Sequence, residues 1–192
     1  MIRNWTYIIT GYTQTAGTRS LLIDLWEKLH RESDPKHSVV LLRPWKSDWE
    51  AEAELVLRAS TSPNWKVRPT IRVCGYSWGA GWGALQFCQA LQRKGLDVER
   101  LALIDPVHRH PLAICRWRTL CPSLIPIYVP SNVSGRVLVF AQRMNWPQAH
   151  RVIQYGVEVH PTIVQCEHGA MDDRPEVIEK CYEFLKGTGD AP

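Results

Sequence analysis

Short apolar runs alternate with amphipathic segments along most of this chain, and this alternation restricts the fold more than any other feature. Near-continuous apolar runs are typical of strands that helices cover on both faces. They occur at 5–12, 37–45, 70–77, 98–106 and 135–142, with a weaker one at 157–166 that Pro161 interrupts. Helical patterns fall between or after them, at 19–30, 48–60, 79–94 and 175–186. The order predicts an α/β fold: a doubly wound, mostly parallel sheet of about six strands.

Local signals set the ends of the predicted helices. Ser47 with Glu50 three residues later has the pattern of a capping box and predicts the start of the helix over 48–60. Gly95 predicts a helix end, and Pro175 a helix start. The 192 residues suit one domain over 1–192.

Composition limits the class of protein. Apolar residues make up 45% and charged residues 22%, and no apolar run approaches the roughly 20 residues of a membrane span. The start of the chain is expected to be a strand rather than a signal peptide. The six scattered cysteines suit reduced thiols in a cytoplasmic protein. No Cys or His spacing indicates a metal site, and a net charge of +4 does not by itself indicate nucleic acid.

The stretch GYSWG places Ser77 between Gly75 and Gly79, after a predicted strand and before a predicted helix. Glycine on either side removes the side-chain collisions of a sharp strand-to-helix turn, and such a turn exposes its central hydroxyl. The N–H groups of the following helix favour a developing negative charge. We expect Ser77 to be a nucleophile; the alternative is a turn without chemistry.

A serine nucleophile needs a base and an orienting acid. Asp105 ends the next strand, and His168 follows the last one, so both are expected at the same sheet edge as Ser77. Of the competing histidines, His160 is expected inside a strand and His150 in a helix or loop. The strand over 135–142 is followed by no carboxylate, which favours Asp105 as the acid.

The oxyanion of such a reaction needs two hydrogen-bond donors. We expect the backbone N–H of Trp78 and that of Tyr12, with Thr13 as the next choice. Trp82, Thr13 and Val107 are predicted to contact the substrate, although Trp82 could equally pack against the sheet. No metal or other cofactor is needed for this chemistry.

With these residues in place, the chain resembles the α/β-hydrolase superfamily, in particular small single-domain esterases and the thioesterase domains of peptide and polyketide synthases. The resemblance rests on VCGYSWGAGWGALQFCQAL, LALIDP and HGAMDD, and runs from Thr6 to Lys186. The thioesterase group places its acid directly after the strand that follows the nucleophile, where Asp105 stands. The chain departs from the family in lacking the two opening antiparallel strands and a His-Gly-Gly motif.

The segment 107–134 is the only candidate for a cap over the site. It contains several Arg and His residues together with Trp117, and either contacts an acyl or anionic group of the substrate or is a solvated loop. The sequence predicts a serine hydrolase of a small carboxylic ester or thioester. The alternatives are a non-catalytic binding protein on the same scaffold, or an acyltransferase.

Overall fold

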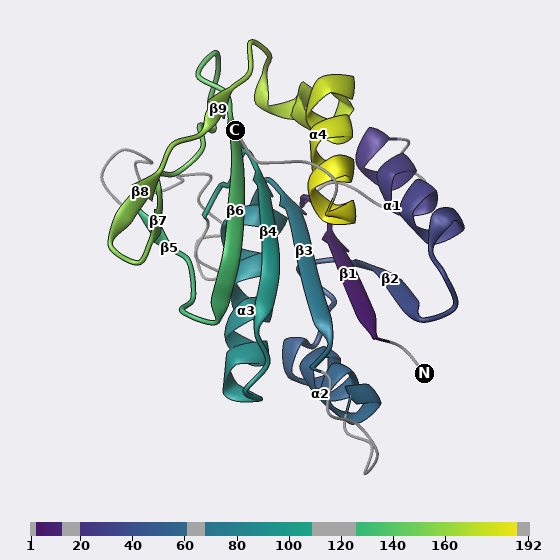
Figure 1. Ribbon diagram of the computed structural model, residues 1–192. Helices are drawn as coiled ribbons and strands as arrows, with labels where there is room; N and C mark the ends of the chain where they lie inside the picture. Colours follow the sequence, from purple (N-terminus) through teal and green to yellow (C-terminus); the bar gives the residue numbers. More distant parts are fainter. Residues whose placement is uncertain (1–2, 13–19, 61–67, 109–125, 188–192) are drawn as a thin grey trace.

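The computed structural model describes residues 3–12, 20–60, 68–108 and 126–187. Six strands form one parallel sheet in the order β2-β1-β3-β4-β6-β9. They are β1 (Asn4–Ile9), β2 (His37–Leu42), β3 (Thr70–Tyr76), β4 (Val98–Ile104), β6 (Val133–Ala141) and β9 (Thr162–Ile163). The predicted fold class is therefore confirmed: this is a doubly wound α/β sheet (Figure 1).

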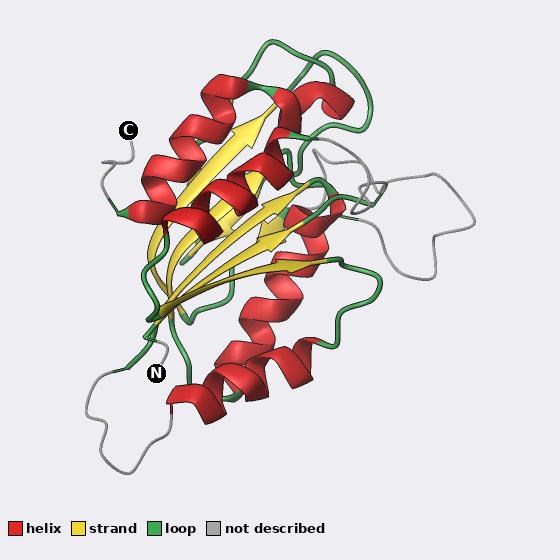
Figure 2. Cartoon of the chain, turned by 90° about the vertical axis from the view of Figure 1, so that its right-hand side faces the viewer, coloured by secondary structure: helices red, strands yellow, loops and turns green. Residues whose placement is uncertain are grey.

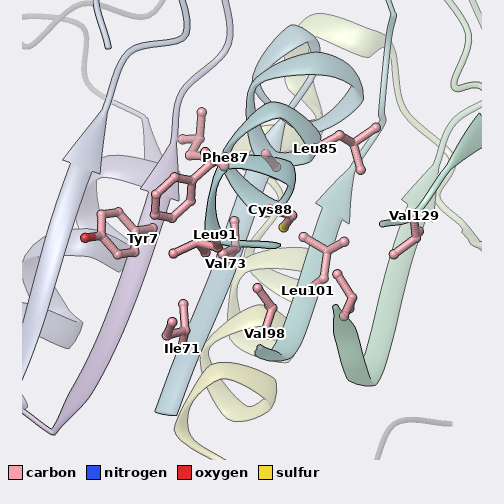
Figure 3. Close-up of a cluster of buried hydrophobic side chains, with 14 of the residues drawn as sticks. Tyr7, Ile71, Val73, Leu85, Phe87, Cys88, Leu91, Val98, Leu101 and Val129 are labelled. Carbon is pink, nitrogen blue, oxygen red and sulfur yellow. The ribbon is translucent and has the colours of Figure 1, made fainter. Parts of the chain in front are cut away.

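Helices lie on both sides of the sheet (Figure 2). One side carries α1 (Leu21–Glu32) and α4 (Pro175–Lys186), whose apolar faces pack on side chains such as Ile8, Cys74 and Ala102. The other carries α2 (Trp49–Ser60) and α3 (Ala84–Arg93), which pack on Tyr7, Val73 and Leu101. Figure 3 shows this second cluster, in which the Tyr7 and Phe87 rings meet at 4.4 Å between centroids. The central strands β1, β3 and β4 are thus buried on both faces over most of their length, which explains their continuous apolar runs.

The direction of the chain reverses beside β1. From β1 the chain crosses to β2 at one edge, and then returns to β3 on the other side of β1. In open α/β sheets, ligands bind at the carboxyl ends of strands where the order reverses in this way. A ligand site is therefore expected at the loops that follow β1 and β3.

Two local predictions were wrong. The first turn of α2 is capped by Asp48, whose Oδ1 accepts the N–H groups of Glu50 and Ala51 at 3.1 Å each, while the Ser47 hydroxyl donates to the carbonyl of Arg43. The predicted strand over 157–166 is two short strands, β8 (Val157–Val159) and β9. Pro161, which has no N–H to donate, lies between them.

A second, smaller sheet was not expected. It joins β5 (Ile127–Tyr128), β7 (Val152–Gln154) and β8 in that order, with β7 and β8 antiparallel. Most of the predicted cap segment, 109–125, lies outside the described residues, so that prediction remains open. The helices that the structure describes are too short or too polar to span a bilayer.

Candidate active site

Ser77 occupies a strained turn at the carboxyl end of β3. Its φ of 54° lies in the left-handed region, which residues other than glycine seldom adopt. The turn leads directly into a π-helical segment, η1 (Gly79–Gly83), that continues as α3. The Ser77 carbonyl accepts the N–H groups of Gly81 at 2.9 Å and Val107 at 3.0 Å. The main chain around Ser77 is therefore held by its contacts with η1 and with the segment after β4.

The glycines of this stretch are needed for close backbone approaches. A Cβ on Gly75 would lie 2.7 Å from the carbonyl oxygen of Gly79, and one on Gly79 would lie 2.7 Å from that of Ile9. A Cβ on Gly81 would overlap the main chain of Val107. These glycines let η1 sit against β1 and against the segment after β4.

The structure brings Ser77, His168 and Asp105 together in one chain of hydrogen bonds. Ser77 Oγ lies 2.8 Å from His168 Nε2, and His168 Nδ1 lies 2.5 Å from Asp105 Oδ2. A carboxylate on Nδ1 fixes the imidazole tautomer in which Nε2 accepts a proton. This geometry equips Nε2 to take the proton of the Ser77 hydroxyl.

Asp105 is fully buried and is held from two directions. It follows β4 with a φ of 44°, also in the left-handed region, and its backbone N–H donates to the carbonyl of Phe140 at 2.8 Å. Its Oδ1 accepts the backbone N–H of Gln142 at 3.2 Å, which leaves Oδ2 directed at His168. Both oxygens thus have partners, as a buried carboxylate requires.

Polar side chains missed in the sequence hold the main chain of His168. Its N–H donates to Asn145 Oδ1 at 2.8 Å. Asn145 belongs to a loop that the buried Gln142 side chain organises, since its amide group donates to the carbonyls of Asn145 and Pro147. The absence of a carboxylate after the strand over 135–142 drew no notice to the amide groups of this loop, which hold His168 in position.

Tyr76 and Asp172 form a second contact with His168. The Tyr76 hydroxyl donates to the His168 carbonyl at 2.6 Å, and the two rings stack with centroids 5.6 Å apart. Asp172 hydrogen bonds to the hydroxyls of Tyr76 and Ser20. Burial, together with the charge of Asp173, raises the pKa of Asp172 from 3.8 to about 6. Burial and then the charge of Asp172 raise the pKa of Tyr76 well above its usual range, so its hydroxyl stays protonated.

The predicted oxyanion donors lie beside Ser77. The loop after β1 passes so close that a Cβ on Gly11 would lie 3.4 Å from Ser77 Cβ. The half-exposed Tyr12 ring contacts the buried Trp78 ring at 5.6 Å between centroids. The placement suits the backbone N–H groups of Tyr12 and Trp78, whose role stays a prediction. Thr13 lies outside the described residues.

A pocket of about 250 Å³ lies against η1 and the start of α3, and its lining includes neither Ser77 nor His168. Its lining includes Gly81, Trp82, Gln86, His108 and Ile127. Trp82 also stacks on Trp78 with centroids 5.0 Å apart, and its predicted contact with substrate stays a prediction. The Val107 side chain is buried, and its predicted contact with substrate stays untested.

The two competing histidines lie elsewhere. His150 is buried in a loop, where its backbone N–H donates to the carbonyl of Pro106 at 2.8 Å. His160 is exposed between β8 and β9, so its expected position inside a strand was wrong. Among the residues that the structure describes, no three His, Cys, Asp or Glu side chains gather as a metal site would require. The cysteines Cys74, Cys88, Cys166 and Cys181 are buried free thiols.

No protein-family model matches the chain, and no curated protein matches it in sequence.

Proposed function

We propose that this protein is a serine hydrolase of the α/β-hydrolase superfamily that cleaves a carboxylic ester or thioester. The observation that carries the proposal is the hydrogen-bond chain from Ser77 Oγ through His168 to Asp105, with distances of 2.8 and 2.5 Å. A protein that only binds a ligand would not need these three side chains to be aligned in this way at the carboxyl edge of the sheet.

The proposed reaction has two halves. His168 Nε2 takes the Ser77 proton as Oγ attacks the substrate carbonyl, and the N–H groups of Trp78 and Tyr12 stabilise the oxyanion. Protonated His168 then gives its proton to the departing alcohol or thiol, which leaves an acyl group on Ser77. Water, deprotonated by His168, attacks this acyl group and releases the acid. Asp105 stabilises the imidazolium in both halves.

Pocket size and lining restrict the substrate. A volume of about 250 Å³ lies just below the usual range for ligand sites, and the lining includes the polar side chains Gln86 and His108. We therefore propose a short, uncharged acyl or alcohol group. Hydrolysis of p-nitrophenyl esters should be fastest for short acyl chains. Activity on long chains alone would contradict this size limit.

Covalent labelling tests the nucleophile directly. A fluorophosphonate should react with wild-type protein at Ser77, as located by peptide mass spectrometry, and should fail to label Ser77→Ala. Ser131→Ala removes an exposed serine far along the chain and is the matched control; it should label normally. Absence of labelling in correctly folded wild-type protein, together with no turnover of any ester, would refute the proposed function.

A further inference from the structure

We propose that Asp172 and Tyr76 are a proton-dependent positioning pair for His168: the protonation state of Asp172 decides whether the Tyr76 hydroxyl is donated to the His168 carbonyl or shared with the carboxylate. The inference rests on the proposed function for its effect on the reaction. Its structural part, the switch in hydrogen bonding, stands without it.

The geometry places both residues directly behind the imidazole. His168 and Asp172 belong to the same short 3₁₀ helix, η3 (His168–Asp173), so a change at one is transmitted through a single turn. Tyr76 is the last residue of β3 and directly precedes Ser77. Its hydroxyl donates to the carbonyl of His168, which lies 92 positions later in the sequence. The pair therefore connects the strand that holds the nucleophile to the turn that holds the base.

The hydrogen bonds among Tyr76, Asp172 and His168 have two arrangements, which differ by one proton. The Tyr76 hydroxyl has one proton, and it has two acceptors within reach, the His168 carbonyl and the Asp172 carboxyl. A protonated Asp172 donates its own proton to the Tyr76 oxygen, so Tyr76 is free to donate to His168. An ionised Asp172 has no proton to give and competes for that of Tyr76, since hydrogen bonds to a charged acceptor are the stronger ones. Ionisation should therefore weaken the bond to His168.

The groups around Asp172 set the pH range in which its carboxyl group ionises. Asp173, on the same turn, is a like charge, and its Oδ1 accepts the Leu21 N–H at 3.0 Å. From α1, the Ser20 hydroxyl and the N-terminal end of the helix face the carboxyl, with Asp24 in the first turn. From β3 comes Tyr76, and beyond it lie Asp105 and His168. Arg174, at the start of α4, donates instead to the carbonyl of Gln165.

The switch can be observed without any catalysis. In a His168→Gln background, which keeps the main chain but removes the titrating imidazole, the amide ¹⁵N shift of Gly169 reports on the preceding carbonyl. We expect this shift to change with a midpoint near pH 6. The midpoint should vanish when Asp172→Asn is added, and also when Tyr76→Phe is added. Asp173→Asn, which removes the neighbouring like charge but keeps Asp172 and Tyr76, should retain a midpoint and shift it to lower pH.

Kinetics test the effect on the base. The rate of Ser77 phosphonylation should be similar in wild type and Asp172→Asn below pH 5, and about threefold higher in Asp172→Asn above pH 7. The asparagine amide can donate to Tyr76 at every pH, which is why the variant keeps the bond. Tyr76→Phe should be about fivefold slower than Asp172→Asn throughout, the effect of one lost hydrogen bond.

The outcomes separate the two proposals. If wild-type Ser77 is not labelled at any pH and the protein turns over no ester, the proposed function fails, and the Gly169 titration still decides the switch. If Gly169 shows no midpoint near pH 6, or the midpoint survives Tyr76→Phe, the switch is refuted. If the titration behaves as expected but the ratio of labelling rates does not change with pH, the pair does not position His168 for reaction, and the proposal is refuted in that part.

Discussion

Replacing Asp172 with asparagine should stabilise the protein at neutral pH, although it removes a buried carboxyl group that accepts hydrogen bonds. Only 5% of Asp172 is exposed, and burial and the charge of Asp173 raise its pKa from 3.8 to about 6. The folded protein therefore binds this proton more tightly than the unfolded chain does. The free energy of unfolding falls as the pH rises from about 4 to about 6, and the loss is complete above that range.

The difference between 3.8 and about 6 gives the size of the effect. It corresponds to about 3 kcal/mol, which the ionised wild-type protein loses and the asparagine variant does not. For a chain of this length, the same change would raise Tm by roughly 6–12 °C. A negative charge near the N-terminus of α1 is favourable by about 0.3–1 kcal/mol, which reduces the gain without reversing it.

Urea unfolding at pH 4 and at pH 7 measures this directly. The variant and the wild type should have similar free energies of unfolding at pH 4, and the variant should be the more stable at pH 7. Asp173→Asn is the comparison variant: it removes the exposed like charge beside Asp172 and leaves the Asp172 carboxyl in place, so the pH dependence should become smaller but should not disappear. An Asp172→Asn effect that is the same at both pH values would refute the reasoning.

Three further predictions concern close backbone contacts and buried polar groups. Gly79→Ala would place a methyl group against the carbonyls of Ile9 and Thr10 and should lower the free energy of unfolding in urea by about 3 kcal/mol. Its control is Gly169→Ala, which has nothing within 4 Å of its Cβ and should change that free energy by less than about 0.5 kcal/mol. Asn132→Ala should cost about 2–4 kcal/mol, because the buried amide donates to the carbonyls of Cys88 and Leu96 at 2.9 Å each; a loss under about 1 kcal/mol would show that water replaces it. Asp105→Asn should slow Ser77 phosphonylation by about three to four orders of magnitude with an unchanged circular dichroism spectrum, and a change of less than about tenfold would contradict its role.

Much of the fold follows from local features of the sequence. Continuous apolar runs define strands that are buried on both faces, and alternation with helices makes the sheet parallel. Because parallel strands end at one edge, residues that follow different strands meet there. That is why Ser77, Asp105 and His168 could be selected together from chain order alone. The glycines at 75 and 79 likewise predicted a tight turn, since only they admit the main-chain contacts seen around it.

Other features depended on which of several neighbouring residues makes a given contact, and sequence patterns do not distinguish between such residues. Ser47 and Asp48 could each cap α2, and the Asp48 carboxylate takes the N–H groups while Ser47 turns back to Arg43. Pro161 was recognised as an interruption, but only the structure shows that the two halves join different sheets. Neither outcome follows from local propensity.

Apolar runs and glycine turns act over short distances along the chain, so they predicted the main strands and helices in their chain order, the burial of the central strands and the three residues that meet at the sheet edge. The side chains that hold His168 in place became visible only in the folded protein. Tyr76 reaches it across 92 positions, Asn145 across 23 and Asp105 across 63. A hydrogen bond between residues so far apart produces no periodic pattern in the sequence. The raised pKa of Asp172 likewise arises only when folding buries its carboxyl group between η3, β3 and the start of α1.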